Sequence, residues 1–369
     1  MLGVEREVAH LVLNLLPKVG PVTVRRLIAR FGSAAAALDA DGRALIDCVG
    51  ESHANSVYRW KEEVDLTTEL SQVESRGVKI VTCEDERFPP LLNALEHLPH
   101  MLYVLGDIQE RDQNAIGVVG TRSLSNYGRD CAQKISFQLA HAGYTIVSGL
   151  ARGIDAVAHQ AALAANGRTI AVLGSGLNHI APPQNRALAQ SIMQSGAVVS
   201  QFPMNKEPDR KTFPIRNHVI SGMSQGVLVV EGARRSGSLI TAGIASEQGR
   251  QVFAVPGPID RPGSTGPNAL IQEGAKLVTR PEDIIEELSG AISTSATDSA
   301  PKLEPTKPKV DLEGVEKAIH ETLKPGELAI DEIIAKTGLS SSEVAASLLR
   351  LEMRRIVRQL PGNRYEVLF

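Results

Sequence analysis

Short apolar runs rich in β-branched residues alternate with helical stretches through the middle of the chain. The runs cover residues 115–119, 144–147, 169–173, 197–199, 227–230 and 251–255. Between the first two, residues 126–142 repeat apolar positions at helical spacing, with Cys131, Ile135 and Leu139 on one face. Strands and helices that alternate in this way predict an α/β fold, a doubly wound sheet of mostly parallel strands with helices on both faces. We place this core at residues 79–289.

The amino-terminal residues have a different pattern. Residues 8–16 are apolar, a break rich in Pro and Gly follows at 17–21, and Val24 and Leu27 resume helical spacing. This predicts two helices joined by a tight turn, within a small helical domain at residues 1–75. The pair is similar to a helix-hairpin-helix, whose turn amides can hold a phosphate. Because the second turn glycine is missing, we favour a plain small helical bundle, with the helix-hairpin-helix as the alternative.

The carboxy-terminal residues fall into a linker and a third domain. Residues 290–310 are rich in Ser, Thr, Pro and Lys and carry too few large apolar side chains to form a core. Beyond this linker, Ser340 and Glu343 form a capping box that starts a helix. The other expected elements are helices at 312–323 and 329–336 and a hairpin at 356–360 and 364–368. Three helices and a hairpin predict a winged helix at residues 311–369.

Composition narrows the class of function. The 39 Lys and Arg residues are balanced by 42 Asp and Glu, so no global basic field marks a nucleic-acid partner and any polyanion site must be local. Aromatic residues make up only 4%, which leaves few rings for stacking on bases. No apolar stretch is long enough to span a membrane and the start lacks the features of a signal peptide, so we expect a cytoplasmic protein. The three cysteines include no CxxC pair and predict neither a disulfide framework nor a zinc site.

The residues that follow the predicted strands carry the candidate chemistry. Small residues gather there beside arginines, in the segments Gly120-Thr121-Arg122, Ser148-Gly149-Leu150-Ala151-Arg152-Gly153, Gly174-Ser175-Gly176 and Glu231-Gly232-Ala233-Arg234-Arg235-Ser236-Gly237-Ser238. Ligands of parallel sheets bind outside the carboxyl ends of the strands, and small residues ahead of a helix let backbone amides converge on an anion. These loops therefore predict one or more phosphate sites. The alternative is that the glycines only form the tight turns that any doubly wound fold requires.

The segment before the fifth predicted strand is unlike a routine crossover. Basic residues there are interleaved with one ring and one amide, in the set Arg210, Lys211, Phe213, Arg216 and Asn217. A groove in which cations follow a backbone while a ring stacks on a base is typical of sequence-tolerant binding to single strands. The alternative places Phe213 in the core and the charges on a solvated rim.

Three familiar enzyme motifs are absent or misplaced. Gly174 and Gly176 follow a strand, but His179 stands at the third glycine of a dinucleotide fingerprint, and the chain has no GxxxxGK[ST] phosphate loop, so we expect no nucleotide cofactor. Residues 222–226 match GxSxG, but they precede a strand instead of following one, so Ser224 is not expected to be a nucleophile. We expect no catalytic residue and no metal.

Five segments together resemble the DNA-processing protein A family of bacterial transformation proteins. They are VGTRSLSNYG from Val119, SGLARGIDAVAH from Ser148, VLGSGLNHIAPPQNRAL from Val172, FPIRNHVISGMSQGVLVVEGARRSGSLITAGIASEQGR from Phe213 and VFAVPGPIDRPGSTGPNALIQEGA from Val252. The match is specific and its segments follow in unbroken order. The terminal domains resemble the family more loosely, as a sterile-alpha-motif-like helical module and a winged helix.

The resemblance implies a Rossmann-like core that binds single-stranded DNA and forms a homodimer. It further implies that the protein loads a RecA-type recombinase on incoming DNA during natural transformation, displacing single-strand-binding protein, without catalysis. By motif position, Arg122 would contact DNA, Phe213 would stack on a base, and Arg210 or Lys211 would pair with the backbone. The full set of implied site residues is Gly120, Thr121, Arg122, Ser148, Gly149, Arg152, Arg210, Lys211, Phe213, Arg216, Asn217, Gly237 and Ser238, of which Ser148, Gly149 and Arg152 would line a phosphate pocket.

A nucleotide-phosphoribohydrolase-like enzyme on a related Rossmann-like core is the alternative function. That class needs a PGGxGTxxE loop with a catalytic carboxylate. The corresponding loop here reads EGARRSGSLITA from Glu231, and the acid is absent from the required position.

Overall fold

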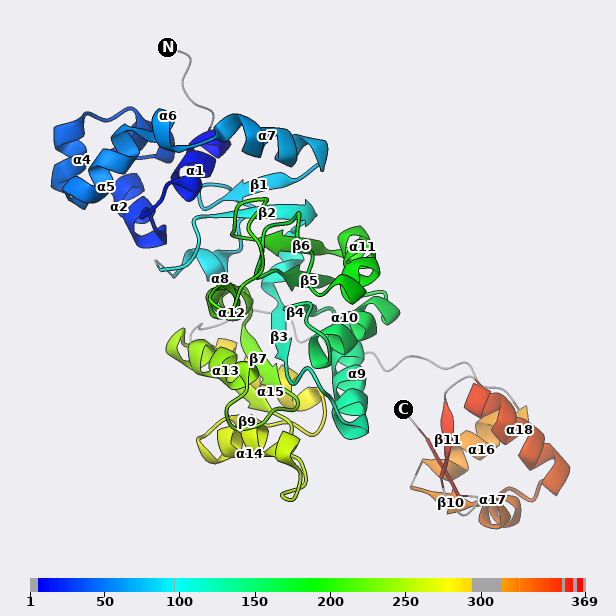
Figure 1. Cartoon of the computed structure of the whole chain (residues 1–369). Helices are drawn as coiled ribbons and strands as arrows, with labels where there is room; N and C mark the ends of the chain where they lie inside the picture. The colour runs from blue at the N-terminus through cyan, green and yellow to red at the C-terminus, as the bar shows by residue number, and fades with distance from the viewer. Residues whose placement is uncertain are drawn as a thin grey trace. The chain divides into compact units, whose positions relative to one another are not determined.

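The computed structural model describes residues 6–95, 97–293, 314–324, 326–353, 356–360 and 364–367. The internal contacts divide the chain into two compact units, Met1–Ala296 and Thr297–Phe369 (Figure 1). The first unit holds both the amino-terminal helices and the central sheet.

A nine-stranded sheet forms the centre of the first unit, in the order β1-β2-β6-β5-β4-β3-β7-β8-β9. The strands are β1 (Lys79–Thr82), β2 (Met101–Gly106), β3 (Ala115–Val119), β4 (Thr145–Ser148), β5 (Thr169–Val172), β6 (Ala197–Ser200), β7 (Gly226–Val229), β8 (Gln251–Ala254) and β9 (Lys276–Leu277). From β6 to β9 all neighbours are parallel, which confirms the predicted sheet. The antiparallel strands β1 and β2 extend it at one edge and were not predicted.

Helices cover both faces of this sheet (Figure 1). They are α8 (Pro90–Asn93), α9 (Asn126–His141), α10 (Ile154–Ala164), α11 (Arg186–Ser195), α12 (Thr212–Gly222), α13 (Gly237–Glu247), α14 (Thr265–Gln272) and α15 (Glu282–Ser293), with short 3-10 turns at Glu110–Gln113, Pro183–Asn185 and Pro262–Ser264. Side chains alternate along β3, so Ile116 and Val118 pack toward α9 and α10, while Ala115 and Val119 pack toward α12 and α13. Both faces of the sheet are therefore buried.

The amino-terminal helices form a bundle with a hydrophobic cluster of its own. They are α1 (Arg6–Leu15), α2 (Pro21–Phe31), α3 (Ala34–Leu38), α4 (Gly42–Val49), α5 (Glu51–Tyr58), α6 (Trp60–Glu63) and α7 (Leu66–Ser75). Val24, Leu27 and Leu45 are fully buried in that cluster. As the sequence predicted, a tight turn separates the first two helices, and Pro21 occupies the first turn of α2, where its missing N–H costs no hydrogen bond.

A buried histidine pair joins this bundle to the sheet. His10 Nδ1 in α1 lies 2.9 Å from His100 Nδ1, and His10 Nε2 lies 3.1 Å from Glu84 Oε1. The rings stack with centroids 5.2 Å apart. Burial lowers the pKa of both histidines, and for His10 the neighbouring Glu84 acts against that shift. At most one proton can therefore lie between the two Nδ1 atoms.

The second unit contains α16 (Gly314–Leu323), β10 (Leu328–Ala329), α17 (Ile330–Thr337), α18 (Ser341–Met353), β11 (Val357–Leu360) and β12 (Arg364–Val367). Its three strands pair in the order β10-β12-β11. Ser340 and Glu343 form the predicted capping box at the start of α18. The predicted linker is wrong at its start, because residues 290–293 complete α15. The rest of the linker, 294–310, and the hairpin turn at 361–363 lie outside the described residues.

Candidate functional site

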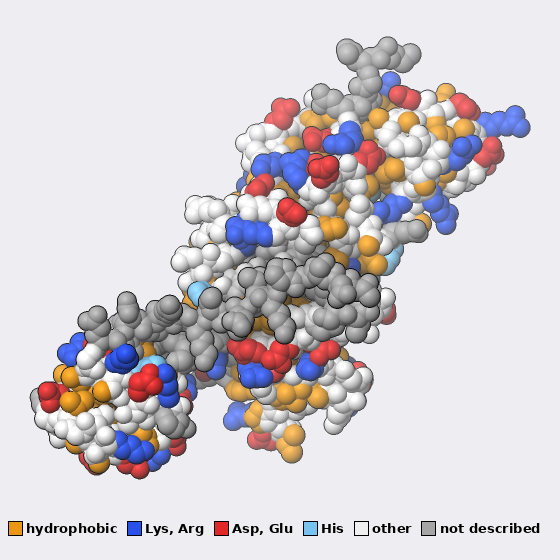
Figure 2. All heavy atoms as spheres, turned by 180° about the vertical axis from the view of Figure 1, so that it is seen from behind, with side chains coloured by type: hydrophobic (Ala, Val, Ile, Leu, Met, Phe, Trp, Pro, Cys, Tyr) orange, Lys and Arg blue, Asp and Glu red, His pale blue; other side chains and the backbone are white. Residues whose placement is uncertain are grey.

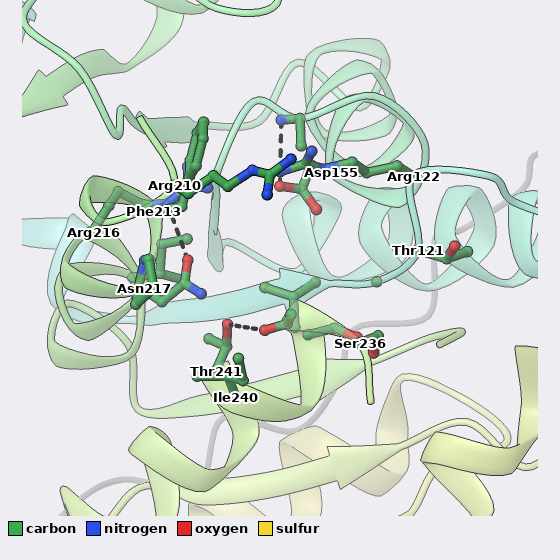
Figure 3. A pocket seen from close by; sticks show the side chains of 17 residues that line it. Thr121, Arg122, Asp155, Arg210, Phe213, Arg216, Asn217, Ser236, Ile240 and Thr241 are labelled. Carbon is green, nitrogen blue, oxygen red and sulfur yellow. Dashed lines mark hydrogen bonds between the residues drawn. The ribbon is translucent and has the colours of Figure 1, made fainter. Parts of the chain in front are cut away.

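A cavity of about 470 Å³ opens at the carboxyl edge of the parallel strands, where the loops after β3, β4 and β7 meet helices α12 and α13 (Figure 3). Most of the site residues implied by the sequence line it, namely Gly120, Thr121, Arg122, Arg210, Phe213, Arg216, Asn217, Gly237 and Ser238. They come from segments far apart in the chain. Parallel strands place their carboxyl ends along one edge of the sheet, and this brings the segments together.

Gly120 allows these loops to approach so closely. A Cβ at this position would lie 2.5 Å from Ile154 Cγ1 and 3.0 Å from the carbonyl oxygen of Glu231, so any side chain would clash. The next residue, Thr121, donates its amide to that same oxygen at 2.7 Å, and its own oxygen accepts from the Ile154 amide at 3.1 Å. The loop after β3 is thereby fixed to both the loop after β7 and the start of α10.

Phe213 is half-buried and lines the cavity near the start of α12. One edge of its ring packs over Gly174, where a Cβ would come within 2.8 Å of Cδ1. The guanidinium carbons of Arg122 and Arg216 lie 5.5 and 5.9 Å from the ring centroid, within the range of cation–π contacts. The ring is thus partly packed against its neighbours, and the rest of it remains accessible from the cavity.

Arg216 is only 5% exposed and is fixed by backbone oxygens. Its Nη1 donates to the carbonyl oxygens of Gly149 and Val172, each at 2.6 Å. Burial lowers the pKa of Arg216 to about 10, and the neighbouring Asp155 acts against that shift. Gly149 has no room for a side chain, because a Cβ would lie 2.2 Å from Nη1. This arginine therefore connects α12 to the ends of β4 and β5.

The loop after β4 agrees only in part with the phosphate pocket that the resemblance implied. The Ser148 hydroxyl is buried and donates to the Val118 oxygen at 2.6 Å. The amides of Gly149 and Ala151 donate to Asp155 Oδ2, at 3.1 and 3.4 Å. The Asp155 carboxylate thus occupies two amides that would otherwise face a phosphate. Gly149 and Arg152 line a smaller adjoining cavity, whereas Ser148 lines neither of the two cavities at this edge. Burial raises the pKa of Asp155, while Arg216 acts against that shift.

The exposed cations that line the larger cavity are Arg122 and Arg210, which reach toward each other over it (Figure 3). Neither forms a salt bridge with a described residue. Arg152 lines a smaller adjoining cavity of about 120 Å³, together with Arg122 and Phe213. Lys211 is exposed but lines neither cavity, so of the two candidates for the backbone contact the structure brings only Arg210 to the site.

Several lining residues were not predicted. Asp155 follows the glycine-rich loop in the first turn of α10, and an acid at that position was the available signal. The apolar wall consists of Pro214, Ile220 and Ile240, and Ile240 is 51% exposed at the cavity. These aliphatic residues resemble any helix face in the sequence, so only the fold identifies them. Gly237 and Ser238 form the first turn of α13, whereas the sequence suggested that they precede the helix.

The remaining sequence motifs do not form a competing site in the described part of the chain. Ser224 of the GxSxG match is fully buried, and its hydroxyl donates to the Ile220 oxygen at 2.8 Å. Among the described residues no group of three or more His, Cys, Asp or Glu side chains is arranged to hold a metal ion, and no helix is long and apolar enough to cross a membrane. Acidic and basic side chains are interspersed on the face drawn in Figure 2, in keeping with surface pairs such as Lys79–Asp107.

Comparison with protein families identifies this architecture. A family model described as DNA recombination-mediator protein A matches residues 79–289, more than half of the chain. The chain belongs to this family. Models for a DprA-like N-terminal HHH domain and a DprA winged helix domain match residues 5–41 and 303–363. The first of these descriptions favours the helix-hairpin-helix interpretation of the amino-terminal turn over a plain bundle.

Individual members of the recombination-mediator family are similar over most of the chain. Protein Smf of Escherichia coli (strain K12) is 43% identical over 302 residues, which cover 81% of this chain and 80% of that protein. The DNA processing protein DprA of Bacillus subtilis (strain 168) is 41% identical over 220 residues, covering 59% of this chain and 74% of its own.

Two solved structures of DNA processing protein A have the same fold as this chain. The X-ray structure of DNA processing protein A from Streptococcus pneumoniae has a TM-score of 0.69 and 31% identity, and covers 76% of this chain and 97% of that one. The second is DNA processing protein A from Helicobacter pylori, whose structure was described for its single-stranded DNA binding mode. It has a TM-score of 0.52 and 27% identity, covering 58% of this chain and 97% of that one.

Proposed function

We propose that this chain binds single-stranded DNA in the cavity between the loop after β3 and helices α12 and α13. The observation that carries the proposal is the convergence of two exposed arginines, Arg122 and Arg210, with the half-buried ring of Phe213 in one cavity. Cations supply attraction to the phosphates, and a ring supplies a stacking surface that accepts any base. The single-stranded DNA binding mode described for the relative from Helicobacter pylori supports this assignment.

The charge distribution supports a short binding site and not a long groove. Asp155 offsets the charge of the buried Arg216, so the attraction for phosphates comes mainly from Arg122 and Arg210. Each phosphate that a protein cation neutralises on a single strand adds about 0.7 to the slope of log affinity against log salt. A site that neutralises two or three phosphates should therefore have a shallow but measurable salt dependence.

A titration with labelled oligo-dT tests this proposal against a duplex of equal length. We expect tighter binding to oligo-dT and an affinity that falls as salt rises. Arg122→Ala should weaken binding and lower the salt slope by about 0.7. Arg59→Ala, which removes an exposed arginine paired with Glu62 in the amino-terminal bundle, is the matched control and should change neither. Equal affinity for the duplex, or no binding at low salt, would contradict the proposal.

We further propose that the protein acts in the cytoplasm as a homodimer and delivers the bound strand to a RecA-type recombinase. In this role it protects incoming DNA during natural transformation and displaces single-strand-binding protein. Membership of the recombination-mediator family supports this role. The chain should shorten the lag before a RecA-type recombinase hydrolyses ATP on DNA coated with single-strand-binding protein. Light scattering should give twice the mass of one chain. An unchanged lag would refute loading without affecting the DNA-binding proposal.

The function as proposed requires no chemical step. In the alternative, a nucleotide-phosphoribohydrolase-like enzyme, a carboxylate would have to reach the sugar of a bound nucleotide. The cavity does contain a carboxylate, Asp155, but it accepts hydrogen bonds from Gly149 and Ala151 and interacts with Arg216. Release of free base from nucleotide monophosphates would favour the enzyme.

A further inference from the structure

The side chain of Asn217 is held in one orientation at the cavity. Arg216 Nε donates to Asn217 Oδ1 at 3.1 Å (Figure 3). An arginine can only donate, so the amide oxygen must face Arg216 and the NH₂ group must face the other way. Arg216 cannot move easily, because its Nη1 is bound to two backbone oxygens at 2.6 Å each. Asn217 therefore presents a fixed pair of N–H donors.

The Asn217 NH₂ group is available to a ligand. No residue in the described part of the chain accepts a hydrogen bond from Nδ2, although the side chain is half-buried and lines the cavity. The charged groups nearby do not supply hydrogen-bond acceptors to a ligand in place of these donors. Arg122 and Arg210 can only donate, and the buried Asp155 already accepts two backbone amides at Oδ2. The exposed cations of the cavity and the Asn217 NH₂ group are thus all donors, while the lining hydroxyls of Thr121, Ser236, Ser238 and Thr241 can act either way.

The cavity is also large enough to hold a base. Its volume is about 470 Å³, and one wall is apolar, formed by Phe213, Pro214, Ile220 and Ile240. A planar base can lie against such a wall while its edge meets the polar side. The site would then choose among bases by the hydrogen-bonding character of that edge.

We propose that Asn217 makes this cavity selective for pyrimidines that carry a carbonyl at position 4, thymine and uracil, over cytosine. The proposal rests on the proposed single-strand binding and adds a base preference to it. Thymine offers an acceptor at O4, whereas cytosine offers a donor at N4 in a ring of nearly equal size. A cytosine amine facing the Asn217 NH₂ group leaves both donors without acceptors, which is unfavourable in a partly buried site.

The test compares oligo-dT, oligo-dU and oligo-dC of one length in competition binding to the full chain, at pH 8. Pyrimidine homopolymers stack weakly, so differences among them report the site. One hydrogen bond is worth about 1 kcal/mol, so oligo-dC should bind about fivefold more weakly than the other two. Oligo-dU should match oligo-dT, because the preference depends on the carbonyl and not on the methyl group.

Asn217→Asp is the decisive variant because it keeps the shape and turns the donor into an acceptor. The added charge should weaken binding of all three oligonucleotides, so the ratio of oligo-dT to oligo-dC affinity is the readout, and we expect it to fall to one or below. Asn126→Asp adds the same charge at an exposed position in the first turn of α9, outside the cavity, and should leave the ratio unchanged.

The outcomes separate the two proposals. No binding of any oligonucleotide by the wild-type chain would overturn the proposed function itself. Binding with equal affinity for oligo-dT and oligo-dC would overturn the base preference and leave the function intact. A wild-type preference that survives in Asn217→Asp, or an oligo-dU affinity no higher than that of oligo-dC, would show that Asn217 is not its source.

Discussion

Replacing Arg216 by alanine tests whether this arginine stabilises the fold or only contacts DNA. The substitution removes the charge that interacts with the buried Asp155 carboxylate, and it leaves the oxygens of Gly149 and Val172 without their donor. Removing one member of a buried charge pair costs about 3–5 kcal/mol, because the other charge stays buried without compensation. We therefore expect Arg216→Ala to destabilise the protein strongly, whatever its effect on DNA binding.

The size of the effect can be converted to a melting temperature. The unfolding entropy is about 2.1 cal/mol/K per residue, which over the unit Met1–Ala296 gives about 0.6 kcal/mol per degree. A destabilisation of about 3–5 kcal/mol then lowers Tm by about 5–8 °C. Thermal unfolding followed by circular dichroism measures this shift directly.

Two further variants make the Arg216 experiment specific. Arg122→Ala removes an exposed arginine over the same ring, so Tm should change by less than about 1 °C while DNA binding weakens. Adding Asp155→Asn to Arg216→Ala should recover part of the stability, because no unpaired charge then remains buried. If Arg216→Ala melts like the wild type and only its DNA binding is impaired, the structural role argued for Arg216 is refuted.

Three other substitutions or conditions test separate parts of the structure. Phe213→Ala should weaken oligo-dT binding by about 1–3 kcal/mol with little change in Tm; a large drop in Tm would assign the ring to the core. Burial lowers the pKa of His10 and His100 below 6.5, so below that pH the unfolded chain binds more protons than the folded one. Stability in urea should therefore fall from pH 6.5 toward pH 5, and a constant stability would contradict the buried pair. Gly153→Ala should destabilise the protein in thermal melts, since φ at this residue is 85° and a Cβ would lie 2.2 Å from a backbone oxygen. Gly243→Ala in α13 is the control: a Cβ there would have no atom within 4 Å, so the substitution should be neutral or stabilising.

The parallel sheet was predictable because its signal is local. Each buried strand is a short β-branched run, and the predicted run 115–119 coincides with β3. The parallel arrangement follows from the intervening helices and places the loops after β3, β4 and β7 at one edge. Strands β1 and β2 lie outside that regular alternation of strands and helices. Strand β2 joins the sheet through β6, more than 90 positions further along the chain, and no local pattern reports this pairing. Helix α12 was missed as well, since Pro214 in its first turn resembles a break until the helix that follows is seen.

The site residues also differ in whether a local sequence signal reports them. Arg122 and Phe213 were found because their motifs are recognisable in the sequence, and both line the cavity. The burial of Arg216 depends on contacts with residues that lie 44 and 67 positions away, and no local pattern reports them. The contacts of Asp155 and Asn217 are local, but they depend on the placement of Arg216: it interacts with the Asp155 carboxylate and orients the Asn217 amide, so the sequence could not show them either.

The most direct test of the account is a titration of labelled oligo-dT with the full chain and with the double variant Arg122→Ala/Phe213→Ala, at low salt. The wild-type chain should bind and saturate. The double variant should bind at least about tenfold more weakly while its Tm stays within about 2 °C of the wild type. Unchanged affinity in a folded double variant would contradict the claim that this cavity is where the protein binds single-stranded DNA.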